Sequence, residues 1–129
     1  MAFNILIVDD SPVMRKVIKR TINLSGIEIG DVVEAGNGKE GLEQLEEHWV
    51  DLILTDINMP VMNGIEFIEN LKTDEVMKSI PIIVISTEGR DAVVQQALSL
   101  GAADYITKPF QPEEIGQDIL KILGYDIEE

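Results

Sequence analysis

Two apolar stretches that run into aspartate decide the fold: Ile-Leu-Ile-Val-Asp-Asp at residues 5–10 and Leu-Ile-Leu-Thr-Asp at residues 52–56. Two more stretches, residues 82–86 and 105–108, end in a serine and a lysine. Apolar runs rich in β-branched residues are typical of buried strands in a parallel sheet. Ligands of open α/β sheets bind outside the carboxyl ends of the strands, so these polar residues are predicted to converge. Three carboxylates, a hydroxyl and an ammonium group are the make-up of a magnesium and phosphoryl site.

Helical patterns separate the apolar stretches along the whole chain. The expected strands are residues 4–8, 32–33, 51–55, 81–85 and 104–107. The expected helices begin at Ser11-Pro12, Asn37-Gly38, Asn63-Gly64, about Arg90 and Gln111-Pro112, and three of them end at Gly26, Gly101 and Gly124. The helical residues expected to face inward are Met14, Val17, Ile18, Thr21, Ile22, Leu42, Leu45, Trp49, Ile65, Ile68, Leu71, Ile115, Ile119 and Ile122.

Five such strand–helix units predict a single α/β domain over residues 1–129, with a doubly wound, five-stranded parallel sheet and five helices. The connections between parallel strands are right-handed, so helices cover both faces of the sheet only if the strand order reverses at some point. The ligand site of such a sheet lies at that reversal. The second strand ends in Glu34-Ala35-Gly36, the weakest candidate for a site. Placing it at the edge gives the flavodoxin-like order 2-1-3-4-5, in which Asp9, Asp10 and Asp56 meet and Ser86 and Lys108 flank them.

Composition narrows the classes of function. The chain has 129 residues, is 45% hydrophobic and contains no cysteine, which excludes disulfides, thiolate metal sites and thiol nucleophiles. A formal charge of −14 is a poor basis for binding nucleic acid. No apolar run approaches the length of a membrane span, and no export signal precedes the first strand, so we expect a cytoplasmic protein without a membrane partner. His48 is expected at the surface, and Met59 and Met62 in loop packing.

Four blocks of sequence together resemble the receiver domain of two-component response regulators, and most of all the chemotaxis-type single-domain regulators. The blocks are Ile-Leu-Ile-Val-Asp-Asp at 5–10, Asp-Ile-Asn-Met-Pro-Val-Met-Asn-Gly at 56–64, Ser86, and Gly-Ala-Ala-Asp-Tyr-Ile-Thr-Lys-Pro-Phe at 101–110. The resemblance covers essentially the whole chain. It implies a stand-alone regulator that accepts a phosphoryl group from a histidine kinase and that catalyses only its own phosphorylation and dephosphorylation.

The resemblance also assigns roles within the site. Asp56 is the implied phosphoacceptor, and Asp10, Asp56 and the backbone carbonyl of Asn58 are the implied ligands of Mg²⁺, or of Mn²⁺ in its place, with Asp9 acting through water. Lys108 and Ser86 would each contact a phosphoryl oxygen. A cis peptide bond is implied between Lys108 and Pro109.

Signal output and its duration follow from the same resemblance. Movement of Ser86 toward the phosphoryl group would open space for the ring of Tyr105, and would alter the face formed by the fourth helix, the fifth strand and the fifth helix. That face carries acidic residues, so its protein target is expected to be basic. Asn58 and Glu88 border the approach of the hydrolytic water, which predicts an acyl phosphate lasting seconds to minutes.

Other interpretations remain open at this point. Chemotaxis is the leading role, and a phosphorelay or another regulatory pathway is the alternative. A flavodoxin-like FMN carrier would need a Ser/Thr/Gly phosphate loop where Asp9 and Asp10 stand. A magnesium-dependent aspartyl phosphatase of the haloacid dehalogenase type would place its nucleophile after the first strand. A receiver detached from a DNA-binding effector fits less well, because the chain ends soon after the last helix.

Overall fold

The computed structural model describes residues 2–124 and confirms a flavodoxin-like α/β fold. Its parallel strands stand in the order β2-β1-β3-β4-β5, as expected. The strands are β1 (Phe3–Val8), β2 (Ile29–Ala35), β3 (Leu52–Thr55), β4 (Ile82–Ser86) and β5 (Asp104–Thr107). The helices are α1 (Pro12–Asn23), α2 (Gly38–Glu47), α3 (Gly64–Lys72), α4 (Asp91–Leu100) and α5 (Pro112–Leu123), with a 3-10 turn η1 (Met77–Ser79). Residue 1 and residues 125–129, which the expected domain limits include, lie outside the described residues.

The helices begin close to the predicted residues, and side chains cap free N–H groups at the starts of α1, α2 and α3. The Ser11 hydroxyl accepts a hydrogen bond from the N–H of Met14 at 3.1 Å, at the start of α1. At the start of α3, Asn63 and Glu66 each accept a hydrogen bond from the other's backbone N–H, which forms a capping box. These caps fix the turns that follow β1 and β3, where the predicted site residues lie.

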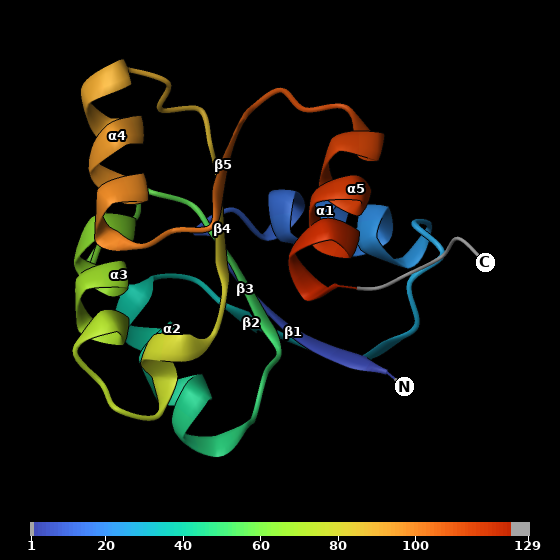
Figure 1. The fold of residues 1–129 in the computed structure, drawn as a ribbon, viewed down its shortest axis with the longest axis horizontal. Coiled ribbons are helices and arrows are strands. Elements are labelled where there is room, and N and C mark those ends of the chain that lie inside the picture. Colours follow the sequence, from blue (N-terminus) through green and yellow to red (C-terminus); the bar gives the residue numbers. More distant parts are fainter. Residues whose placement is uncertain (1, 125–129) are drawn as a thin grey trace.

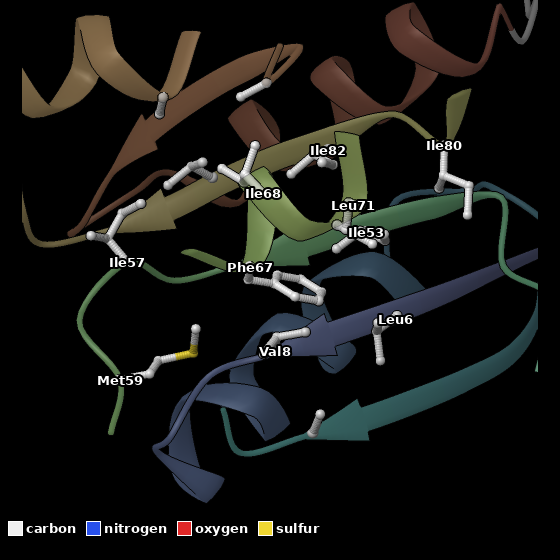
Figure 2. Close-up of a cluster of buried hydrophobic side chains, with 14 of the residues drawn as sticks. Leu6, Val8, Ile53, Ile57, Met59, Phe67, Ile68, Leu71, Ile80 and Ile82 are labelled. Atoms are coloured by element: carbon white, nitrogen blue, oxygen red, sulfur yellow. The ribbon is translucent and has the colours of Figure 1, made fainter. Parts of the chain in front are cut away.

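The sheet is buried on both faces, with α1 and α5 on one side and α2, α3 and α4 on the other (Figure 1). Alternate residues of β1 contribute to the two cores: Leu6 and Val8 face α2 and α3, whereas Ile5 and Ile7 face α1 and α5. In Figure 2 the ring of Phe67 from α3 lies beside Val8 and Leu6 from β1. Burial on both faces explains why β3, β4 and most of β1 consist of continuous apolar runs, whereas the edge strands β2 and β5 contain polar residues.

Four sequence expectations about the elements are wrong. Trp49 is 59% exposed, because α2 ends at Glu47 and His48 adopts an extended backbone that takes Trp49 off the helical stripe. Val17 is 42% exposed, because α5 leaves its side chain at the rim of a groove between the two helices. The first helix ends at Asn23, and Gly26 lies in the turn beyond it. The second strand covers seven residues, because β1 offers it a parallel partner along its full length.

Within residues 2–124, none of the helices combines the length and the apolar character that crossing a bilayer requires.

Candidate functional site

The register of the sheet brings the aspartates together at the carboxyl ends of β1 and β3. Val8 and Thr55 are partners across the two strands, so Asp9 and Asp56 leave the sheet side by side. The N–H of Asp56 donates to the carbonyl of Val8 at 2.9 Å, which continues the strand pairing into the site. Asp9, Asp10 and Asp56 can each offer one carboxylate oxygen, with all three oxygens within 4.8 Å of one another. The expected convergence of the three carboxylates is therefore present.

Asp9 is held by four residues from three segments of the chain. Its carboxylate accepts hydrogen bonds from the N–H of Ser11 at 2.9 Å and from the ammonium group of Lys108 at 2.9 Å. Its backbone N–H donates to Ala35, and its backbone carbonyl accepts a hydrogen bond from Arg15 at 2.7 Å. Asp9 is only 1% exposed. This residue is thus fixed in place, whereas its neighbour Asp10 is exposed.

Lys108 bridges the two buried aspartates. Its ammonium nitrogen lies 2.9 Å from Asp9 Oδ2 and 3.2 Å from Asp56 Oδ2. Burial alone would lower the pKa of Lys108, but the hydrogen bond that Lys108 donates to Asp9 and the charges of both aspartates outweigh it and raise the pKa. Lys108 therefore stays protonated and offers a fixed positive charge beside Asp56. The peptide bond between Lys108 and Pro109 is cis, as the resemblance implied.

The donor set fits a small, hard divalent cation. Three carboxylates converge, and oxygen ligands of this kind are what Mg²⁺ and similar cations prefer; Asn58 lies exposed on the loop two residues after Asp56. One oxygen of Asp56 accepts a hydrogen bond from the N–H of Ile57 at 2.6 Å, and the other faces Lys108. Asp56 keeps 8% exposure, so this carboxylate can be reached from solvent. These groups could hold a metal ion beside a carboxylate that has one oxygen turned toward a cation.

The loop after Asp56 is tightly packed against the start of α3. The N–H of Gly64 donates to the carbonyl of Ile57 at 2.8 Å, and a Cβ at Gly64 would overlap the backbone of Asp56 and Ile57. Val61, at the exposed tip of this loop, has a φ of 68°, which is a left-handed conformation that β-branched residues rarely adopt. A glycine at position 64 is therefore required for Asp56 to stand where it does.

Ser86 ends β4, and Tyr105 lies near the start of the neighbouring strand β5. Ser86 is fully buried, and its hydroxyl accepts a hydrogen bond from the N–H of Glu88 at 3.1 Å. The Tyr105 hydroxyl donates to the backbone carbonyl of Glu88. Burial raises the pKa of Tyr105, although a hydrogen bond with Ser86 opposes this effect. Ser86 and Tyr105 are therefore linked through the backbone of Glu88 in this structure.

The carboxylate of Glu88 is engaged by Arg90. Its two oxygens accept hydrogen bonds from the guanidinium nitrogens Nε and Nη2 at 2.8 and 3.0 Å. These bonds lower the pKa of Glu88. Glu88 was expected to border the path of a hydrolytic water, and Arg90 is the partner that sequence reasoning did not foresee. The pairing leaves Glu88 ionised and held toward the start of α4.

A second group of carboxylates lies between β5 and α5. Asp104, Glu114 and Asp118 line a small pocket of about 160 Å³ together with Tyr105. The Asp118 Oδ2 atom is buried and, among the described residues, has no hydrogen-bond partner. Burial, reinforced by a hydrogen bond with Asp104 and by its charge, raises the pKa of Asp118 to about 7. The two aspartates therefore hold a proton between them near neutral pH.

Sequence reasoning also missed an ion pair beside the aspartates. Arg15 of α1 lies 2.9 Å from the carboxylate of Glu34, the residue near the end of β2 that was judged the weakest candidate for a site. Their contact depends on the pairing of β1 with β2, and no spacing along the chain announces it. The one feature of the sequence that could have pointed to this contact is the position of Arg15, one helical turn after the Ser11 cap.

The fold and this geometry define a phosphoryl-receiving signalling domain, and comparison with known proteins agrees. Residues 5–120 match the family described as the response regulator receiver domain, and the chain belongs to this family. The membership disfavours the flavin-carrier and dehalogenase-type alternatives.

Relatives and solved structures narrow the resemblance further. The chain is 42% identical to "Chemotaxis protein CheY1" of Helicobacter pylori over 121 residues, which cover 93% of this chain and 96% of that protein. The crystal structure of a putative response regulator from Chloroflexus aurantiacus superposes with a TM-score of 0.87 at 26% identity, covering 96% and 99% of the two chains. A CheX–CheY–BeF₃–Mg²⁺ complex from Borrelia burgdorferi contains a chain with a TM-score of 0.82 and 32% identity, covering 93% and 88%. The chain thus closely resembles single-domain chemotaxis regulators.

Proposed function

We propose that this protein is a stand-alone response regulator that accepts a phosphoryl group from a histidine kinase onto Asp56. The observation that carries the proposal is the position of Asp56, which lies beside Asp9 and Asp10 and has one oxygen 3.2 Å from Lys108. In the reaction, a carboxylate oxygen of Asp56 forms a bond to phosphorus as the bond from phosphorus to the kinase histidine nitrogen breaks. The histidine keeps the electron pair of that bond and takes up a proton.

Two anions must approach each other in this step, so electrostatic stabilisation is the main requirement. We propose Mg²⁺, replaceable by Mn²⁺, held by Asp10, Asp56 and the carbonyl of Asn58, with Asp9 contributing through water. When bound, the ion would neutralise charge on the phosphoryl oxygens. Lys108 would move from its pairing with the aspartates to a phosphoryl oxygen, and the Ser86 hydroxyl would donate to another.

The proposed role is chemotaxis signalling in the cytoplasm, with a phosphorelay or other regulatory pathway as the alternative. Receiver domains are phosphoryl-accepting modules, and we propose that this one acts only on itself and not on a separate substrate. The names of the relatives support chemotaxis, since "Chemotaxis protein CheY1" is 42% identical to this chain. Neighbouring flagellar and chemoreceptor genes would favour this role, and their replacement by a phosphotransfer protein would favour the alternative.

The proposed output surface is formed by α4, β5 and α5. Ser86 and Tyr105 are linked through Glu88, whose backbone N–H donates to the Ser86 hydroxyl and whose backbone carbonyl accepts from the Tyr105 hydroxyl. A movement of Ser86 toward a phosphoryl group would therefore be passed to Tyr105. Glu114 and Asp118 line a pocket on this surface, whereas Glu113 lines the groove toward α1. A partner that docks against β5 and α5 is therefore expected to offer basic side chains, and added salt should slow its association.

Beryllofluoride, which mimics a phosphoryl group, tests this proposal when amide chemical shifts are recorded with and without Mg²⁺. The expected result is a set of Mg²⁺-dependent changes that begins at Asp56 and reaches Tyr105 and α4. Changes confined to the surroundings of Asp56 would refute the proposed output surface. An absence of changes at Asp56 itself would refute the acceptor assignment.

A further inference from the structure

The guanidinium group of Arg15 connects the metal-binding turn to the neighbouring strand. Nη1 donates to the backbone carbonyl of Asp9 at 2.7 Å, and Nε donates to a carboxylate oxygen of Glu34 at 2.9 Å. The Arg15 side chain is 19% exposed and that of Glu34 is 38% exposed, so solvent screens the pair only in part. Hydrogen bonds from a guanidinium group are charge-assisted, and the rigid fork of arginine suits two acceptors at once.

The carbonyl that Arg15 holds belongs to the peptide unit between Asp9 and Asp10. A peptide unit is planar, so fixing its carbonyl also fixes its N–H and the direction in which the Asp10 Cα leaves it. Asp10 is exposed, in contrast to Asp9, whose carboxylate is fastened by Ser11 and Lys108. The backbone of the turn carries the Asp10 carboxylate, and Arg15 holds that backbone directly at the peptide unit before Asp10.

We propose that Arg15, anchored by Glu34, is a positioning residue that orients Asp10 for binding of a divalent cation. This inference rests on the metal site of the proposed function. Residues that orient metal ligands through hydrogen bonds, without touching the metal, typically contribute about 10- to 100-fold to metal affinity. The contact lies on a backbone carbonyl, so we expect the lower end of that range.

The charge of Arg15 and its positioning of the turn have opposite effects on Mg²⁺ affinity. The direction in which affinity changes when Arg15 is replaced therefore tests the inference. A positive charge close to the site repels a cation, so a purely electrostatic Arg15 would weaken Mg²⁺ binding and its removal would tighten it. A positioning Arg15 has the reverse effect, because its removal frees the turn. An Arg15→Lys variant keeps the charge and loses the two-pronged geometry, which separates the two contributions.

The experiment measures Mg²⁺ affinity of the full chain by calorimetry and by amide chemical shifts. The variants are Arg15→Gln, Arg15→Lys and Glu34→Ala, and Lys16→Gln is the matched control, since it removes the same charge from an exposed position on the same helix. Unfolding in urea reports the stability of each variant separately. We expect about tenfold weaker binding in Arg15→Gln and a clear weakening in Arg15→Lys, with Lys16→Gln near wild type. In the Arg15→Gln background, Glu34→Ala should add nothing, because Glu34 acts through Arg15.

Unchanged or tighter Mg²⁺ binding in Arg15→Gln would overturn the inference, as would full affinity in Arg15→Lys. A loss of stability with normal affinity would make Arg15 a structural residue only. If Arg15→Gln does not fold, Arg15→Lys and Glu34→Ala decide the question. A wild-type chain that does not bind Mg²⁺ would instead refute the metal site of the proposed function.

Discussion

Replacement of Asp118 by asparagine should change how the stability of the protein depends on pH. Asp118 shares a pocket with Asp104 and Glu114, and the positive charge of Lys121 opposes the effect of their negative charges. Arg20 of α1 lines a different groove, between α1 and α5, and does not line the pocket of Asp118. The buried Oδ2 atom of Asp118 gains a partner only when it carries a proton that it can donate to Asp104. Ionisation therefore leaves two carboxylates facing each other.

The direction of the effect follows from the raised pKa. The pKa of Asp118 rises from 3.8 to about 7 on folding, so its favourable contribution is complete below pH 3.8 and is lost progressively as the pH rises to about 7. With the full shift, the free energy of unfolding would fall by about 4 kcal/mol between pH 3.8 and about pH 7. Asp118 is only half-buried, and screening by water reduces the expected change between pH 5 and pH 8 to about 1 kcal/mol.

Urea unfolding of the wild type and Asp118→Asn at pH 5 and pH 8 measures this change. The wild type should lose about 1 kcal/mol relative to the variant on going from pH 5 to pH 8, because asparagine does not ionise and can donate to Asp104 at both values. Glu113→Gln, which removes an exposed charge from the same helix, is the control and should follow the wild type. If the free energies of unfolding of the wild type and Asp118→Asn differ by the same amount at both pH values, the shared proton is refuted.

Three further predictions concern the acceptor loop and the phosphorylated state. Val61→Asn should raise the free energy of unfolding by about 1 kcal/mol, because Val61 is 76% exposed with a φ of 68° and asparagine tolerates that conformation better; lower stability in urea would contradict this. Gly64→Ala should lower the free energy of unfolding by about 2–3 kcal/mol, because the added Cβ would stand 3.0 Å from the carbonyl carbon of Asp56 and closer still to its oxygen. A near-normal urea midpoint would contradict this and show that the loop relaxes. The acyl phosphate on Asp56 should decay in seconds to minutes, because Asn58 and Glu88 leave room for a hydrolytic water; a lifetime of hours in a decay assay would contradict this.

The strands and their order were predictable from the sequence because parallel strands are buried on both faces. Short apolar runs rich in β-branched residues, such as residues 5–8 and 82–85, are typical of such strands. The polar residue after each run then located the site, because parallel strands all present their carboxyl ends at one edge. Trp49 shows the limit of this reasoning: it continues the apolar period of α2, but the helix ends two residues earlier.

Contacts between distant segments could not be predicted, because they depend on geometry that no local pattern encodes. Arg15 meets Glu34 only through the pairing of β1 with β2, and Asp118 meets Asp104 only when α5 folds back over β5. Glu88 was assigned a place near the site by its spacing from Ser86, but the spacing gave no indication that Arg90 would bind its carboxylate.

The most direct test of the account is to identify the residue that carries the phosphoryl group. The full chain is treated with acetyl phosphate and Mg²⁺, the acyl phosphate is converted at once to a stable alcohol by borohydride reduction, and the reduced position is mapped by tandem mass spectrometry of the peptides, with EDTA-treated protein and Asp56→Asn alongside. The account predicts modification at Asp56 alone, with none in EDTA and none in the variant. Modification of Asp9 or Asp10 in the wild type, or full labelling of Asp56→Asn or of the EDTA-treated protein, would contradict it.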